Sequence, residues 1–204
     1  MGAVDRRPPA FWVGFGFKSM LFMLLLLPLL RPDLEQYQGK GMNWRILVFP
    51  LACLVIPVLW RLTGSRAPYP YLADNLLVVV PLTDVLWNTV DAYDRVWGWD
   101  KANHLVNSMI FAAVIGLLAG RYPLGALNRF ALALGLGMTL QVLWEIGEYV
   151  TFLARSDVAN LYADTIGDLG FALIGSLAGA GFALLATNEA IEEQSDAEPA
   201  TALA

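Results

Sequence analysis

Long apolar stretches alternate with short polar connections along the whole chain. Each stretch approaches the roughly 20 mostly apolar residues that a helix needs to cross a bilayer. The stretches cover residues 11–30, 44–62, 72–91, 100–120, 127–153 and 162–186. The third is the most polar and contains Pro81, but neighbouring helices in a membrane can satisfy the carbonyl group that a proline frees. The pattern therefore predicts an all-α fold, a polytopic transmembrane helical bundle with about six spans.

Polar residues recur at helical spacing within the last four stretches. Intervals of three, four or seven residues place side chains on one helix face. The sets are Asp84, Asn88 and Asp91; Asp100, His104 and Asn107; Gln141, Glu145 and Glu148; and Asp164 with Asp168. Short connections join the third helix to the fourth and the fifth to the sixth, so all four sets are expected at one membrane face. Ionisable groups in spanning segments are costly, which indicates a functional site.

Composition supports one membrane domain and a short tail. The chain has 204 residues, of which 57% are hydrophobic and 15% charged, and this is too apolar for one soluble domain to bury. We predict a single transmembrane domain over residues 1–187 and a disordered acidic tail over residues 188–204. Cys53 is the only cysteine, which excludes an intrachain disulfide and a thiolate metal cluster within one chain.

Basic residues do not orient the bundle. Apart from Lys18, which lies within the first stretch, they divide six against six between the two predicted sides, so the positive-inside rule gives no answer. They are also few and scattered, which argues against nucleic-acid binding. Lys18 is expected to reach the interface by snorkelling. Trp144 is expected either in an interfacial aromatic belt or lining the polar site.

The polar motifs resemble a known membrane family. The segments are Asp100-Lys101-Ala102-Asn103-His104, then Trp144-Glu145-Ile146-Gly147-Glu148, then Asp164-Thr165-Ile166-Gly167-Asp168 with Gly175 downstream. Together they resemble the YjdF-like family of bacterial inner-membrane proteins, and more distantly the VanZ-like group, over residues 84–179. A tryptophan associated with the last motif is absent, because Gly167 precedes Asp168. The resemblance implies a multi-pass protein of the bacterial inner (cytoplasmic) membrane with an important polar cluster, and no particular reaction.

The carboxylates of this cluster require compensation. So many acids cannot all stay ionised in a low-dielectric space, and the nearby cations Lys101 and Arg95 are expected to face water. Oxygen ligands with one imidazole suit a divalent ion such as Mg, Mn, Ca or Fe, and Zn less well. The predicted metal ligands are Asp100, His104, Glu145, Glu148, Asp164 and Asp168. His104 and Glu145 are also the candidate catalytic acid/base groups. Asp84, Asn88, Asp91, Asn107 and Gln141 are predicted to support them.

Three functions remain open at this point. The leading hypothesis is a metal-dependent site that binds or acts on a lipid or lipid-linked headgroup, with membrane lipids as partners. The second is a proton-coupled transporter or carrier in which His104 relays protons. The third is a structural polar network that locks the bundle. Gly175 and Gly179 have the small-xxx-small spacing that allows close helix packing, either within the chain or in a homo-oligomer.

Overall fold

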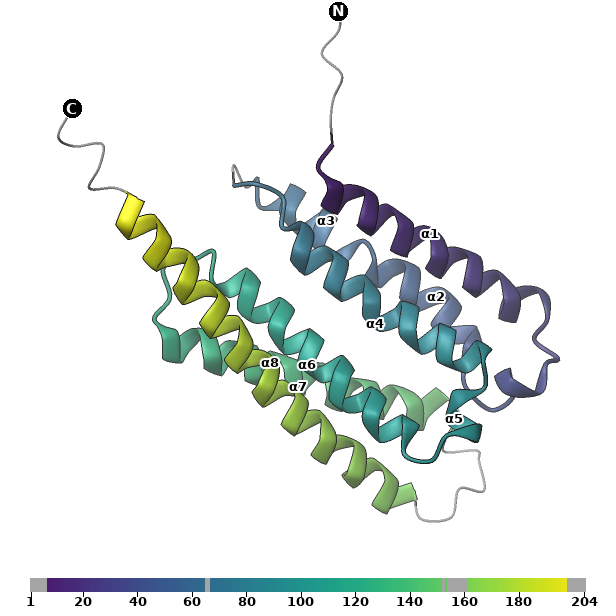
Figure 1. Cartoon of the computed structure of the whole chain (residues 1–204). Coiled ribbons are helices and arrows are strands. Elements are labelled where there is room, and N and C mark those ends of the chain that lie inside the picture. The colour runs from purple at the N-terminus through teal and green to yellow at the C-terminus, as the bar shows by residue number, and fades with distance from the viewer. Residues whose placement is uncertain (1–6, 65–66, 152, 154–160, 198–204) are drawn as a thin grey trace, which may run out of the picture.

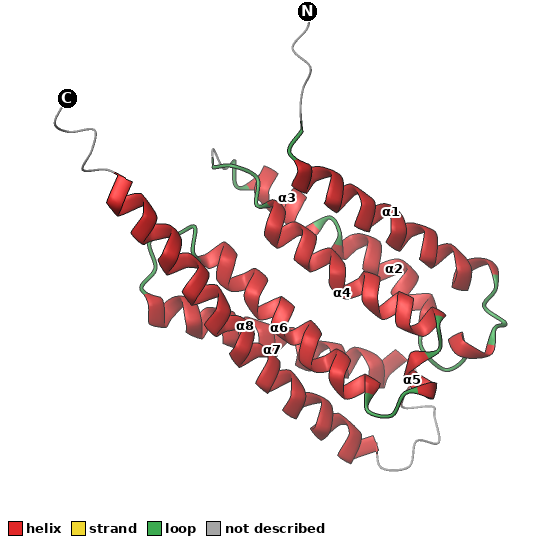
Figure 2. Cartoon of the chain, in the orientation of Figure 1, coloured by secondary structure: helices red, strands yellow, loops and turns green. Residues whose placement is uncertain are grey.

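The computed structural model describes residues 7–64, 67–151, 153 and 161–197, and within these it contains helices and no strand (Figure 2). The helices are α1 (Pro9–Leu30), α2 (Met42–Ala52), α3 (Val55–Leu62), α4 (Tyr71–Thr89), α5 (Ala92–Arg95), α6 (Trp99–Ala119), α7 (Ala126–Thr151) and α8 (Leu161–Ala197), with a 3-10 turn, Glu35–Tyr37, after α1. The helix α8 passes the predicted domain boundary at residue 187, and residues 198–204 of the predicted tail lie outside the described residues. An all-helical chain is confirmed.

Within the part of the chain that the structure describes, five segments are long and apolar enough to cross a membrane. They are Pro9–Leu30, Met42–Leu62, Trp99–Ala119, Ala126–Thr151 and Leu161–Ala186. The predicted third span forms the 19-residue helix α4, which is not among them. Three of its polar residues, Asp74, Asp84 and Asn88, are buried inside the bundle. The expected six spans are therefore five apolar helices with the more polar α4 packed beside them.

The second span is broken between α2 and α3. The break lies at Cys53 and Leu54, four and three residues before Pro57. A proline has no N–H to donate to the carbonyl four residues earlier, and its ring crowds that carbonyl. The helix accordingly stops near Cys53 and restarts at Val55.

The outer surface is strongly apolar. Leucines on several helices are largely exposed, among them Leu30, Leu62 and Leu127. A soluble monomer rarely exposes contiguous apolar patches larger than a few hundred Å². Lipid chains are the solvent that this surface fits, which supports a multi-pass membrane bundle.

The helices form two groups that meet along α4 and α6. The helices α1 to α4 make one group and α6, α7 and α8 the other (Figure 1). The start of α1 and the end of α8 lie at the same end of the bundle (Figure 1). At the opposite end lie α5, the end of α7 and the starts of α6 and α8. Together with the end of α4, the ends of α6, α7 and α8 found here carry most of the predicted polar residues.

Two glycines let α6 and α8 approach closely. A Cβ atom at Gly175 would clash with the carbonyl oxygen of Leu105, and one at Gly179 with that of Met109. The small-xxx-small spacing is therefore used within one chain. It gives no support to the predicted homo-oligomer.

Replacing either glycine is expected to destabilise the bundle. Gly175→Ala or Gly179→Ala should lower the free energy of unfolding by about 1–3 kcal/mol, because backbone atoms of α6 must move to admit the methyl group. The measurement is denaturant unfolding in detergent. Gly170→Ala and Gly181→Ala are matched controls on α8, because a Cβ atom there meets nothing within 4 Å. Equal stability of the two pairs of variants would contradict the close packing.

Candidate functional site

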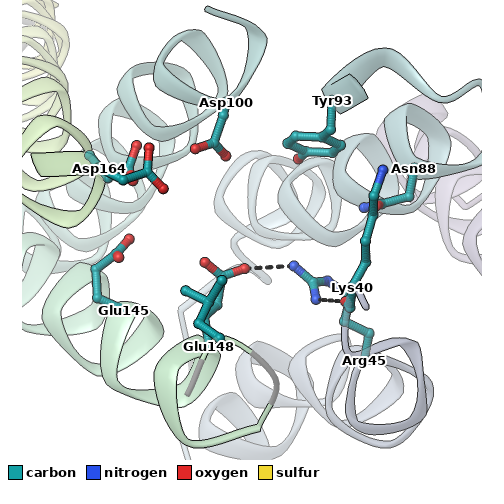
Figure 3. A pocket seen from close by; sticks show the side chains of 10 residues that line it. Lys40, Arg45, Asn88, Tyr93, Asp100, Glu145, Glu148 and Asp164 are labelled. Atoms are coloured by element: carbon teal, nitrogen blue, oxygen red, sulfur yellow. Dashed lines mark hydrogen bonds and ion pairs between the residues drawn. The ribbon is translucent and has the colours of Figure 1, made fainter. Parts of the chain in front are cut away.

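A polar cavity of about 220 Å³ opens at the α5 end of the bundle. It is lined by Lys40, Arg45, Asn88, Tyr93, Asp100, Glu145, Glu148, Leu153, Asp164 and Asp168. Figure 3 shows Asp100, Asp164 and Glu145 on one side of this cavity and Arg45 with Lys40 on the other. Each of the four predicted polar sets thus contributes at least one side chain to the lining of this cavity.

Arg45 is the main residue that the sequence analysis missed. It is buried near the start of α2, where its Nε donates to Asp84 Oδ2 at 2.9 Å and its Nη2 to Glu148 Oε1 at 2.7 Å. Its Nη1 also donates to the carbonyl of Lys40 (Figure 3). These bonds join α2, α4 and α7, and we call Arg45, Asp84 and Glu148 the arginine clamp. The signal available in the sequence was an arginine inside the apolar stretch at residues 44–62.

Tyr93 and Asn103 extend the arginine clamp towards α6. The Tyr93 hydroxyl donates to Asp84 Oδ1 at 3.1 Å, and Asn103 Nδ2 donates to the Tyr93 oxygen at 2.8 Å. Burial and the neighbouring Asp84 carboxylate raise the pKa of Tyr93 well above its usual value, so the hydroxyl keeps its proton. Asn88 donates to the backbone carbonyl of Asp84 at 2.9 Å. Asp84 is therefore held by partners on three sides.

His104 is the centre of a second group, formed with Asp100, Glu145 and Asp168, which we call the histidine centre. Its Nδ1 lies 3.5 Å from Glu145 Oε1, while its Nε2 lies 3.7 Å from Asp100 Oδ1 and 3.8 Å from Asp168 Oδ1. These distances are longer than good hydrogen bonds. Glu145 Oε1 is buried, and within the described part of the chain it has no hydrogen-bond partner. The imidazole is thus surrounded by carboxylates without being tightly bonded to them.

The prediction that Lys101 faces water is wrong. Its side chain is only 25% exposed, and its Nζ lies 2.8 Å from Asp168 Oδ1 and hydrogen-bonds to Asp164. The same Nζ lies 3.6 Å from Asp100 Oδ2. A lysine at the start of α6 reaches α8 because Gly167 leaves room for its methylene chain. Arg45 and Lys101 therefore neutralise part of the negative charge of the acids. Protons or metal ions need to compensate only the remainder.

The predicted exposure of Arg95 is confirmed. Its side chain is 74% exposed and its Nε donates to Asp91 Oδ2 at 2.8 Å. That hydrogen bond lowers the pKa of Asp91. Asp91 lies between α4 and α5 with a positive φ of 61°, and its other ion pair, at 3.7 Å, is with Lys40. It borders the site but does not line the cavity.

The remaining predicted residues lie deeper in the bundle. Asn107 and Gln141 are buried and line a small cavity of about 30 Å³ together with His104 and Trp144. Trp144 stacks on Phe49 with a centroid distance of 6.0 Å. Its ring also lies 5.2 Å from the Arg45 guanidinium carbon. Trp144 thus packs beneath both polar groups, whereas Trp97 is almost fully exposed.

Lys18 forms an ion pair instead of reaching the interface alone. Its Nζ lies 2.8 Å from Asp74 Oδ2 and joins α1 to α4 at the other end of α4 from Asp84. The sequence prediction for this residue was incomplete because the partner lies on a helix 56 positions away.

Among the described residues, two overlapping groups could hold a metal ion. They are Asp100 with His104 and Asp168, and His104 with Glu145 and Glu148, and the ligand atoms of each lie within 4.8 Å of one another. Each group has one carboxylate oxygen that already accepts from a cation: Asp168 Oδ1 from Lys101 in the first group, and Glu148 Oε1 from Arg45 in the second.

Comparison with known proteins places the chain among membrane proteins. Residues 17–189 match the model of a family described as "Predicted membrane protein (DUF2238)". No curated protein and no solved structure matched the chain. The matched region contains every predicted site residue, and the finer resemblance to YjdF-like or VanZ-like proteins stays a prediction.

Proposed function

The chain belongs to the predicted membrane protein family DUF2238, and we propose that its histidine centre binds a divalent metal ion. Through this ion the site would bind or act on a lipid or lipid-linked headgroup. The observation that carries the proposal is the setting of His104. Both ring nitrogens face carboxylate oxygens, at 3.5–3.8 Å. Glu145 Oε1 is also buried without a hydrogen-bond partner among the described residues.

The spacing of these atoms suits an ion at either ring nitrogen of His104. Ligand atoms that lie about 2.0–2.4 Å from a metal ion are about 3–4 Å from one another in octahedral or tetrahedral geometry. The contacts of Nε2 with Asp100 and Asp168 and the contact of Nδ1 with Glu145 fall in this range. One ion bonds only one ring nitrogen, so it would be held by Nε2 with Asp100 and Asp168, or by Nδ1 with Glu145 and Glu148. Carboxylates with one imidazole favour Mg, Mn, Ca or Fe over Zn.

The charge balance also favours a divalent ion. Arg45 pairs with Asp84 and Glu148, and Lys101 with Asp164 and Asp168. Asp100 and Glu145 are left with contacts no shorter than 3.5 Å. A bound divalent cation would compensate whichever of these carboxylates lies beside it, and for the buried Glu145 an uncompensated charge is especially costly.

The position of the site supports a headgroup as its ligand. The cavity lies at the end of the bundle, beside α5 and the starts of α6 and α8, where headgroups meet a membrane protein. A bound ion would polarise a carbonyl or phosphoryl oxygen, and His104 or Glu145 would transfer a proton. Both are buried and adjacent, as acid/base groups of one centre require.

Metal analysis of the purified protein tests the proposal. The native chain is expected to retain a divalent metal, and the double variant Glu145→Ala plus Asp168→Ala is expected to lose it. Asp74→Asn is the matched control, because Asp74 is another buried acid, paired with Lys18, outside the cavity lining. Equal metal content in the native chain and the double variant would count decisively against the metal site.

A proton-coupled transporter is the second candidate, favoured by the place of the cavity between the two helix groups. Arg45 and Asn88 line it from the first group, while Glu145 and Asp168 line it from the second. Relative motion of the groups would change access to the carboxylates, as alternating access requires. His104→Ala should then abolish proton flux in proteoliposomes, and unchanged flux would remove the main support for this function.

The arginine clamp supports a structural role for part of the predicted site. Asp84 and Glu148 both accept from one buried guanidinium that ties three helices together. A purely structural network explains these two acids well. It does not account for the buried Glu145 oxygen, which has no hydrogen-bond partner among the described residues, or for the long contacts of His104.

A further inference from the structure

An apolar groove runs from the polar site along the outside of α6 and α8. Its volume is about 660 Å³. Its apolar lining consists of Trp97, Ala102, Leu105, Val106 and Phe171. Trp97 is 99% exposed, and Val106 and Phe171 are also exposed. In a bilayer such a groove faces lipid, and acyl chains are the ligand that its lining fits.

The groove ends at the carboxylates of the polar cavity. Asp100 and Asp164 line both the groove and the 220 Å³ cavity. Their side chains are 42% and 44% exposed, so a molecule in the groove can reach them. A lipid with its chain along α6 and α8 would therefore hold its headgroup against these two acids.

The charge at this end selects the headgroup. Lys101 is the cation that lines the groove, and it is already shared between Asp164 and Asp168. Asp100 Oδ1 faces His104 and belongs to the histidine centre, whereas the ion-pair contact of Asp100 Oδ2 among the described residues is a long one, 3.6 Å to Lys101. A further positive group that donates hydrogen bonds would complement these oxygens, and charge-assisted bonds are the strong ones. A trimethylammonium group cannot donate, and a purely anionic headgroup would meet like charge.

We propose that this groove binds a phospholipid whose headgroup ends in a primary ammonium, of the phosphatidylethanolamine type. The acyl chain lies along Leu105, Val106 and Phe171, and the ammonium lies between Asp100 and Asp164. This inference rests on the proposed function in one respect: it names the lipid that reaches the histidine centre.

Lipid retention by the purified protein tests the inference. The protein is exposed in mild detergent to phosphatidylethanolamine, phosphatidylcholine or phosphatidylglycerol with identical chains, and bound lipid is counted by native mass spectrometry. Phosphatidylethanolamine is expected to be retained about tenfold better than the others, the effect of about 1.4 kcal/mol from added charge-assisted hydrogen bonds. Equal retention of all three lipids, or preference for phosphatidylglycerol, would overturn the proposal.

Groove-filling variants separate this inference from the metal site. Ala102→Trp and Val106→Trp place an indole in the groove from exposed positions of α6. They should reduce phosphatidylethanolamine retention about tenfold and leave metal content unchanged. Leu132→Trp is the control, because Leu132 is an exposed residue of α7 outside the groove lining.

Lipid retention and metal content test the two proposals separately. Unchanged lipid retention in both groove variants would refute the groove, whatever the metal content. Loss of metal in Glu145→Ala plus Asp168→Ala is the separate measure of the histidine centre. A native chain without metal that still prefers phosphatidylethanolamine would refute the metal proposal and leave the groove in place.

Discussion

Replacing Arg45 by leucine is expected to lower the free energy of unfolding by about 3–5 kcal/mol. The guanidinium is buried and bonded to two acids, Asp84 and Glu148, whose side chains are 4% and 14% exposed. Removing it leaves both carboxylates uncompensated in the interior, which costs far more than the loss of one exposed ion pair. Unfolding in detergent by denaturant, followed by tryptophan fluorescence, measures the change.

Two further variants show whether charge is the cause. Arg31→Leu removes an arginine from a solvent-exposed pair with Asp33, and it should change stability by no more than about 0.5 kcal/mol. Arg45→Leu combined with Asp84→Asn and Glu148→Gln removes all three charges and should recover most of the loss. If Arg45→Leu alone were as stable as the native chain, the arginine clamp would not hold the helices together.

Lys101→Met is expected to make the stability of the bundle depend more strongly on divalent metal than that of the native chain. The ammonium of Lys101 is bonded to the same Asp168 oxygen that belongs to the histidine centre, so it competes with an ion for that ligand. Without the ammonium, the metal-free variant carries an uncompensated acid and should melt below the native chain. A divalent ion at 100 times its dissociation constant should then restore about 2.7 kcal/mol. Melting curves in chelator and in added Mg, Mn, Ca or Zn provide the measurement.

Lys40→Met is the matched control for this experiment. Lys40 also lines the cavity, but its ion pairs are with Asp94 at 2.6 Å and with Asp91 at 3.7 Å, outside the histidine centre. Its stability should not respond to added metal more than that of the native chain. A Lys101→Met protein that melts at one temperature in chelator and in every metal solution would speak against ion binding at His104.

The candidate site could be predicted in position but not in its pairing. Helical spacing placed His104, Glu145 and Asp168 at one end of neighbouring helices, because turns of a helix repeat regardless of what surrounds them. The partners of the acids could not be read in the same way. Arg45 meets Glu148 from 103 positions away, and Lys101 meets Asp168 from 67 positions away. Long flexible side chains make such contacts only once the helices are packed.

By itself the sequence determined the all-helical membrane class, most helix positions and the end of the bundle that carries the acids. Hydropathy and the helical period are local properties, so the length of an apolar stretch and the spacing of its polar residues are enough to predict them. The tertiary structure alone decided that the polar helix α4 packs inside the bundle, that Gly175 and Gly179 serve α6 within the same chain, and that the acids divide between the arginine clamp and the histidine centre. These outcomes depend on which helices become neighbours, because packing and electrostatic pairing act over a few ångströms of space rather than along the sequence.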